Sequence, residues 1–300
     1  MRSSPQIALL ADGRRLHLQD GPIDLIVGAK GRAADIRVAY DAAARRFTGL
    51  LDELCAELAE LRAAADPARC ALKGAVARRM HAAVAPFAGE CFITPMAAVA
   101  GAVAEEILGA MTKEAPLDRA YVNNGGDIAL HLGNREQFTL GMMDRPDRLG
   151  VMRTMIIDTD DPSRGVATSG RHGRSFSLGI ADSVTVLAET ASQADAAATV
   201  IANAVDLPGH PAITRCPADE LQPDSDLGAR LVTRDVGKLA DDEIERALDA
   251  GARCARQLLT LGLVEGVALC LHGEIAIVGI GGSETSGSQP PGGTAVGRLV

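Results

Sequence analysis

The sequence predicts an α+β fold in which a mixed or antiparallel sheet packs against alanine-rich helices. Short apolar runs separated by turn residues occur in blocks, as in hairpins and meanders, and do not alternate strictly with helices. Aromatic residues make up only 2% of the chain and tryptophan is absent, so the core has to be built from small aliphatic side chains. The 300 residues suit one domain or two interleaved lobes.

The N-terminal part of the chain carries strand signals first and helix signals afterwards. Apolar runs between turn residues predict strands, and apolar residues at helical spacing or after a Pro-containing start predict helices. We expect strands at 6–10, 14–18 and 23–27, and helices at 33–64, from Asp66-Pro67 to about Ala85, and at 96–110.

The remaining residues are expected to form a meander, two further helices and a closing hairpin. We expect strands at 119–123, 128–132, 137–142, 152–158 and 183–188, a helix capped by Ser192 to about Ala204, a loop at 208–226, a helix capped by Asp241 or Asp242 to about Leu261, and strands at 265–271 and 274–280. Residues 281–300 are rich in Gly, Ser and Pro, which predicts a disordered tail after a single domain over 1–280.

Charge and cysteine usage exclude several classes of protein. The net charge of −9 argues against nucleic acid as a partner, because a phosphate backbone needs clustered Lys and Arg. No apolar stretch reaches membrane-spanning length, so we expect no membrane contact. The six cysteines form no Cys-x-x-Cys pair and are expected to be free thiols in a reducing compartment. These observations predict a cytoplasmic protein.

A glycine turn lies between two expected strands, at Asn124, Gly125, Gly126 and Asp127. Glycine permits positive φ, so one interpretation is a tight hairpin turn. The other is that the glycines let the backbone approach a ligand while Asn124 and Asp127 supply polar contacts. The residues alone favour neither interpretation.

A second polar segment, Thr168-Ser169-Gly170, precedes Arg171, His172 and Arg174. Two hydroxyls, an unhindered N–H and basic side chains within seven positions are typical of an anion-binding nest. The alternative is a polar surface turn, which is the better interpretation of any single residue, and His172 alone would be a solvated loop histidine.

Asp195 and Thr199 stand four residues apart on an alanine-rich helix, so their oxygens share one face. A hard cation such as Mg²⁺ prefers a carboxylate with neutral oxygens. The alternative is that Thr199 bonds to a helix carbonyl and Asp195 interacts with the helix dipole. Asn203 extends this polar stripe by one turn. Glu105 and Glu106 are expected to be a solvated pair.

Taken in order, these motifs resemble the ApbE-like superfamily. Its characterised members are FAD:protein FMN transferases, which bind FAD and Mg²⁺, cleave the pyrophosphate and move FMN onto a Thr or Ser of a client protein. The resemblance covers about Thr94 to Val205. The segments that carry it are Asn123–Ile128, Ala167–Gly170, Ser183–Ala188 and Ala194–Thr199.

The resemblance implies a flavin nucleotide, FAD or FMN, as ligand, with Mg²⁺ as cofactor. Asp195 and Thr199 match the metal-binding Asp and Thr of the family, and a backbone carbonyl near Ala98 would complete the protein's ligands. The residues that match segments lining the nucleotide are Asn124, Gly125, Gly126, Asp127, Thr168, Ser169 and Gly170, with Arg171 or Arg174 positioning the pyrophosphate.

The chain also departs from the transferases. They carry a Ser-His-Ile-x-Asp-Pro-x-Thr-Gly segment before the Val-Thr-Val strand, where this chain has only Phe176–Ser183, and the family lysine position is Gly101 here. The chain therefore resembles a shorter, uncharacterised branch of the superfamily. No catalytic residue follows from the match, and Asp182 and His172 are the only candidates.

Three functions are compatible with these residues. The first is a Mg²⁺-dependent enzyme that transfers FMN or cleaves the pyrophosphate of FAD. The second is a non-catalytic flavin-binding module that has lost the reactive segment. The third is a structural or partner-binding protein in which the motifs only support the fold. A client protein or a second copy of the chain is the macromolecular partner that these functions allow.

Overall fold

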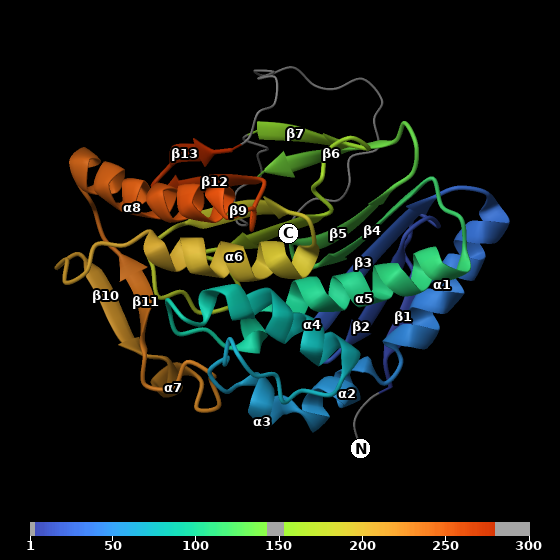
Figure 1. The fold of residues 1–300 in the computed structure, drawn as a ribbon, viewed down its shortest axis with the longest axis horizontal. Coiled ribbons are helices and arrows are strands. Elements are labelled where there is room, and N and C mark those ends of the chain that lie inside the picture. The colour runs from blue at the N-terminus through green and yellow to red at the C-terminus, as the bar shows by residue number, and fades with distance from the viewer. Residues whose placement is uncertain (1–3, 143–152, 280–300) are drawn as a thin grey trace.

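One nine-stranded antiparallel sheet forms the centre of the computed structural model, which describes residues 4–142 and 153–279 (Figure 1). Neighbouring strands follow the order β1-β2-β3-β4-β5-β8-β9-β12-β13, and each of these pairs is antiparallel. The predicted α+β class is therefore confirmed, with an antiparallel sheet.

The strands of the large sheet are short, and the first and last of them form its two edges. They are β1 (Gln6–Leu9), β2 (Leu16–Asp20), β3 (Ile23–Lys30), β4 (Arg119–Asn124), β5 (Asp127–Leu132), β8 (Gly165–Ser169), β9 (Ser183–Ala188), β12 (Gly266–Leu271) and β13 (Glu274–Val278). Two separate hairpins are formed by β6 (Gln137–Met142) with β7 (Arg153–Asp158), and by β10 (Ile213–Pro217) with β11 (Leu231–Val236).

The longer helices lie over one face of the sheet (Figure 1). They are α1 (Ala33–Phe47), α4 (Ala75–Val84), α5 (Val99–Glu114), α6 (Ala191–Ala204) and α8 (Asp241–Thr260). The shorter ones are α2 (Leu50–Ala56), α3 (Leu58–Leu61), α7 (Ala218–Leu221) and the 3-10 turns η1 (Ala85–Phe87) and η2 (Pro95–Ala98).

Strand alternation divides the core between the two faces of the sheet. Along β4, Val122 points toward the helices, whereas Tyr121 points to the opposite face and packs on Phe138 of the β6–β7 hairpin. Those two rings meet edge to face, with centroids 6.2 Å apart. These rings therefore pack on the face of the sheet away from α5 and α6, and small side chains of these helices such as Ala102 and Ala198 lie in the core on the other face.

Glycines bring α5 and α6 unusually close together. A Cβ on Gly101 of α5 would stand 2.2 Å from the carbonyl oxygen of Ala191, the first residue of α6. A Cβ on Gly165 of β8 would stand 2.1 Å from the backbone of Thr190. Both positions need glycine, because the neighbouring atoms belong to backbone and cannot move aside as a side chain does.

Two predictions about the helices were wrong. The helix expected over 33–64 is interrupted at Gly49, which adopts φ 85°. The helix expected from Asp66 begins at Ala75, because the carboxylate of Asp66 accepts the N–H of Ala68 and forms a turn there. The N–H groups before α4 are instead bound by the side chain of Glu57.

The predicted caps of α6 and α8 also differ from the observed ones. Thr190, not Ser192, accepts the N–H of Gln193 at the start of α6. Ala240 precedes α8, and the carboxylate of Glu243 accepts its N–H at 2.8 Å.

Two further segments were assigned incorrectly. The segment Thr168-Ser169-Gly170 is not a surface turn throughout, because Thr168 and Ser169 end strand β8, which lies between β5 and β9. The expected loop at 208–226 contains β10 and α7, and β11 follows it.

Some predictions fall outside the described residues or are not tested by them. The tail at 281–300 and the first residue of the strand expected from Met152 lie outside that part of the chain. The single domain over 1–280 stays a prediction. None of the described helices combines the length and the apolar character needed to cross a bilayer.

Candidate functional site

The glycine turn, the end of β8 and the start of α5 meet at one end of the sheet. The side-chain amide of Asn124 donates to the carbonyl of Ala100 at 3.2 Å, which joins the end of β4 to the first turn of α5. The carboxylate of Asp127 accepts the N–H of Thr168 at 3.2 Å, which joins β5 to β8. Two of the three segments chosen from sequence are thus in direct contact.

The turn itself is a tight hairpin of two residues. Gly125 and Gly126 adopt φ of 66° and 116°, and the side chain of Asn123 accepts the N–H of Gly126 at 2.8 Å. The interpretation as a hairpin turn is confirmed. It is compatible with a ligand site, because the glycines leave the backbone uncovered by side chains of their own.

Asp195 reaches from α6 to the N-terminus of α5. Its carboxylate accepts the N–H of Gly101 at 3.0 Å and is also bonded by the N–H of Ala100. The first N–H groups of a helix lack partners inside the helix, so Asp195 caps α5 from a neighbouring element. The close approach of the two helices at Gly101 makes this contact possible.

The third segment chosen from sequence joins the site through electrostatics. Burial raises the pKa of Asp195 well above its usual range, and the neighbouring carboxylate of Asp127 raises it further. The N–H groups of Gly101 and Ala100 act in the opposite direction, and Glu105 adds to the increase. Asp195 and Asp127 therefore repel each other across the space between the glycine turn and α5.

Asp127 shows the same effect. Burial raises its pKa from 3.8 to about 7, although the N–H of Thr168 and the positive charge of Arg174 lower it. Each carboxylic residue keeps some accessible surface, yet protein atoms crowd around both carboxyl groups. Because the two carboxyl groups are crowded by protein atoms and close enough to repel each other, one of them is readily protonated or the pair binds a cation.

Other oxygens lie along the same elements. Thr199 is partly exposed one turn beyond Asp195 on α6, and its hydroxyl bonds to no residue in the described ranges. Ala98 is the residue at which η2 gives way to α5, three residues before Gly101, whose N–H Asp195 binds. Asn203 is used structurally, because its side-chain oxygen accepts the N–H of Leu178 at 2.9 Å.

Thr168 and Ser169 point to opposite faces of the sheet. The hydroxyl of Thr168 bonds to that of Thr185 at 2.9 Å on the face away from the helices, while Ser169 lies on the helix-covered face. Thr168 therefore contacts the carboxylate of Asp127 through its backbone N–H and not through its hydroxyl. Gly170 follows with φ 149°, and a Cβ there would stand 2.5 Å from the carbonyl oxygen of Asp182.

Arg174 lies against the glycine turn. Its guanidinium occupies the space that a side chain at position 125 would fill, with Nη2 1.8 Å from an ideal Cβ on Gly125. Arg174 is exposed and makes no hydrogen bond or ion pair with the described residues, so only its electrostatic effect on Asp127 ties it to the site.

The two catalytic candidates form a separate buried cluster. Oδ1 of Asp182 accepts from Nε of Arg171 at 2.8 Å and lies 3.2 Å from Nε2 of His172. Oδ2 accepts the backbone N–H of His272 at 2.6 Å, in the turn between β12 and β13. Asp182 thus joins three segments, and Arg171 is held by this carboxylate.

Replacing Asp182 with asparagine should destabilise the protein by about 2–3 kcal/mol, because the buried guanidinium of Arg171 loses its counter-charge. The free energy of unfolding in urea measures the change. Asp242→Asn on exposed α8 is the control and should shift stability by less than about 0.5 kcal/mol. Equal stability of the two variants would contradict a structural role for Asp182.

The prediction of a solvated pair at Glu105 and Glu106 was wrong. Arg79 forms ion pairs with Glu105 at 3.1 Å and Glu106 at 2.8 Å, and Arg46 contacts Glu106 at 2.7 Å. Glu105 also accepts the N–H of Ser192 at 2.6 Å and so caps α6. Two adjacent acids on an otherwise apolar, alanine-rich helix were the available signal for such contacts.

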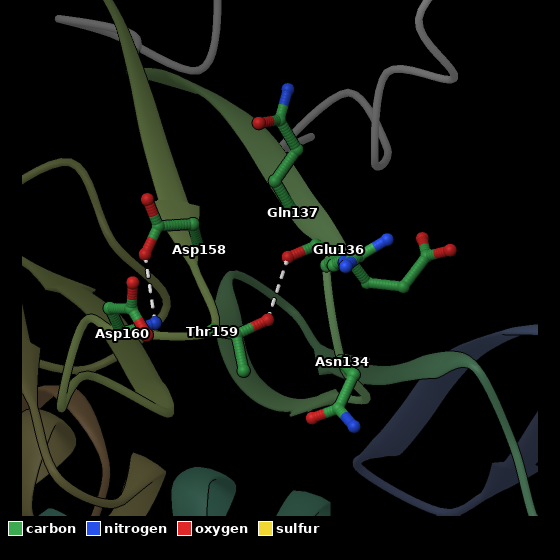
Figure 2. A pocket seen from close by; sticks show the side chains of 7 residues that line it. Asn134, Glu136, Gln137, Asp158, Thr159 and Asp160 are labelled. Carbon is green, nitrogen blue, oxygen red and sulfur yellow. Dashed lines mark hydrogen bonds between the residues drawn. The ribbon is translucent and has the colours of Figure 1, made fainter.

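A surface pocket of about 490 Å³ lies elsewhere, at the open end of the β6–β7 hairpin (Figure 2). Its polar groups are used within the loops: the Thr159 hydroxyl donates to the carbonyl of Glu136, and Asp158 accepts the N–H of Asp160. None of the site residues predicted from sequence lines it. The residues lining it are Asn134, Arg135, Glu136, Gln137, Asp158, Thr159 and Asp160.

Within residues 4–142 and 153–279, no group of three or more His, Cys, Asp or Glu side chains is arranged to hold a metal. A cation at Asp127 and Asp195 would therefore need neutral protein oxygens, water or ligand oxygens to complete its coordination. Mg²⁺ commonly binds in this way, through one or two carboxylates together with substrate phosphates.

The chain matches the family described as AbpE bacteria over residues 7–277. It belongs to this family. The match includes the glycine turn, β8, α5 and α6, so every element of the candidate site lies inside the AbpE bacteria region.

Part of the chain is also similar to archaeal proteins. A UPF0280 protein of Methanopyrus kandleri is 41% identical over 140 residues, which cover 44% of this chain and 51% of that protein. A UPF0280 protein of Methanothermobacter thermautotrophicus is 41% identical over 118 residues, covering 39% and 44%. The chain spans about half the length of the curated relatives it matches, and their names state no activity.

Proposed function

We propose that the chain binds a flavin nucleotide, FAD or FMN, together with Mg²⁺, and that it cleaves the pyrophosphate of FAD. The observation that carries the proposal is the pair of crowded carboxyl groups, Asp127 and Asp195, between the glycine turn and the N-terminus of α5. The order of its motifs, which resembles ApbE-like transferases, and the family name support the same ligand class.

The residues fit a hard cation. Asp195 keeps lone pairs beyond those that bind the N–H groups of α5, and the hydroxyl of Thr199 has no protein partner in the described chain. The carbonyl of Ala98 would add a neutral oxygen. Mg²⁺ would cancel the repulsion between Asp127 and Asp195 and, when bound with the nucleotide, stabilise charge on the phosphate oxygens.

The same end of the sheet fits a diphosphate. The glycine turn brings backbone close to a ligand, and Arg174 supplies a positive charge beside it. Cleavage breaks the bond between the bridging oxygen and the FMN phosphorus and forms a new P–O bond to water or to a client hydroxyl. The proton of that hydroxyl is released, and AMP leaves with the bridging oxygen.

Purified protein incubated with FAD and Mg²⁺ should release AMP, measured by chromatography, and Asp195→Asn should reduce the rate at least about 100-fold, because the metal loses its only charged ligand on α6. Asp242→Asn, the same substitution on the surface of α8, is the control and should keep the full rate. Release of AMP at equal rates by both variants, or its absence from the wild type, rejects the enzymatic function.

A second function is favoured by one observation. The chain lacks the Ser-His-Ile-x-Asp-Pro-x-Thr-Gly segment, and Asp182 is held by Arg171 and the N–H of His272. A non-catalytic flavin-binding module would have these features. FMN or FAD should then raise the melting temperature with no dependence on Mg²⁺ and without AMP release. A protein that binds neither flavin nor metal would instead serve as a partner-binding scaffold.

The cytoplasm is the compartment we propose for this activity. The six cysteines are free thiols, including the buried Cys270 and the partly buried Cys216 and Cys254. Free thiols of this number are typical of a reducing compartment. A client protein that accepts the flavin would be present in the same compartment.

A further inference from the structure

Arg174 lies beside the candidate site, where its positive charge would repel a divalent cation and attract a diphosphate. Its guanidinium rests on Gly125 and acts electrostatically on Asp127, which in turn repels Asp195. No hydrogen bond or ion pair with a described residue fixes it, and it belongs to an exposed loop. A Cβ at position 125 would stand 1.8 Å from Nη2, so a side chain there would displace the guanidinium from the turn.

We infer that the positive charge of Arg174 beside the glycine turn makes this site favour a Mg²⁺–diphosphate complex over bare Mg²⁺. The inference rests on the proposed function and concerns how that site selects its ligand. The guanidinium offsets part of the negative charge of Asp127.

A bare divalent cation arriving at the carboxyl groups meets the positive charge of Arg174. Coulomb repulsion between the two positive charges lowers the affinity of the site for the bare cation. A diphosphate that carries the cation brings negative oxygens with it, and these pair with the guanidinium as it leaves the turn. The exposed loop lets Arg174 move, because no hydrogen bond or ion pair of its side chain with a described residue has to be broken.

The expected consequence is positive coupling between metal and diphosphate. Each ligand should raise the affinity of the other by the same factor, as thermodynamic linkage requires. Part of that factor comes from Arg174. Its guanidinium lowers the affinity for the metal when the metal binds alone, and it raises the affinity for the diphosphate when the diphosphate binds with the metal.

The test is calorimetric titration of the full chain with MgCl₂ alone, and with inorganic pyrophosphate in the presence of Mg²⁺. Arg174→Gln should bind bare Mg²⁺ about fivefold more tightly and pyrophosphate about tenfold more weakly than the wild type. Arg174→Lys should remain close to the wild type for bare Mg²⁺, because it keeps the charge. Arg246→Gln on α8, an exposed arginine far along the chain, is the control and should change neither affinity.

The two effects of Arg174→Gln have opposite signs, which a merely structural role does not produce. Parallel loss of both affinities, or no change in either, overturns the inference while the proposed function stands if Asp195→Asn abolishes Mg²⁺ binding. A wild type that binds neither Mg²⁺ nor pyrophosphate overturns both.

Discussion

Without a divalent cation, the melting temperature of the protein should fall by about 5–10 °C between pH 5 and pH 8. The cause is the carboxyl pair at the glycine turn. In the folded chain the pKa of Asp127 is raised from 3.8 to about 7, and that of Asp195 is raised as well. A raised pKa means that the folded state binds more protons than the unfolded state between these values.

The sign of the pH dependence follows directly. The stabilisation is complete below the usual carboxyl pKa and is lost as the pH rises through about 7, because both groups must then be charged side by side. Each unit of pKa shift corresponds to about 1.4 kcal/mol, so the pair contributes a few kcal/mol in total, which gives the shift in melting temperature stated above.

Calorimetry in EDTA at the two pH values measures this effect, and two comparisons isolate its source. Asp127→Asn should flatten the pH dependence, because the amide still accepts the N–H of Thr168 without a charge. MgCl₂ should restore stability at pH 8 in the wild type but not in Asp195→Asn. An unchanged pH dependence in Asp127→Asn would show that other groups, not this pair, are responsible.

Local sequence signals were sufficient for most of the sheet but not for β8. Ser183–Ala188 is a continuous run of strand-forming residues, and the structure has β9 with these bounds. Gly165–Ser169 contains glycine and two hydroxyl residues and so has the composition of a turn. It forms a strand because β5 and β9 supply hydrogen-bond partners on both sides, and those partners are distant in sequence.

The same limit explains the errors at helix starts. Asp66-Pro67 is a good local start signal, yet α4 begins only at Ala75, where the carboxylate of Glu57 binds the free N–H groups. A cap supplied from 17 residues away has no local signature. Asp195 is the stronger case, because it caps a helix that begins nearly a hundred residues earlier in the chain.

Individual components of the candidate site could be predicted from the sequence. The spacing of Asp195 and Thr199 and the glycines at 125 and 126 identified two of its components, and the resemblance placed them together. What the spacing did not reveal is that Asp127 and Asp195 act on each other, or that Asp182 is committed to Arg171 and the β12–β13 turn. The position of Asp195 beside Asp127 depends on the packing of α5 against α6.

That packing depends on Gly101, and Gly101→Val should therefore destabilise the protein more than any other single change considered. Even the first carbon of a side chain would stand 2.2 Å from the carbonyl oxygen of Ala191 and 2.7 Å from the nitrogen of Ser192. Both atoms belong to the backbone of α6, so the helices have to separate. Overpacking of this kind costs about 3 kcal/mol or more, and valine adds a β-branched side chain to a helix.

Gly109→Ala provides the matched control, since Gly109 lies two turns further along α5 and a Cβ there meets no atom within 4 Å. It should stabilise the protein by about 0.5–1 kcal/mol, because alanine favours the helix. Urea unfolding of both variants measures the contrast, and a loss below about 1 kcal/mol for Gly101→Val would refute the close helix contact.

The same substitution connects the fold to the site. Separation of α5 from α6 moves the N–H of Gly101 away from the carboxylate of Asp195, which it now meets at 3.0 Å. Gly101→Ala, the mildest form of the change, should then weaken Mg²⁺–pyrophosphate binding even where the protein still folds. A lysine at this position, as in the transferases that the chain resembles, has no room against Ala191. The glycine therefore marks a site built around helix contact instead of a basic side chain.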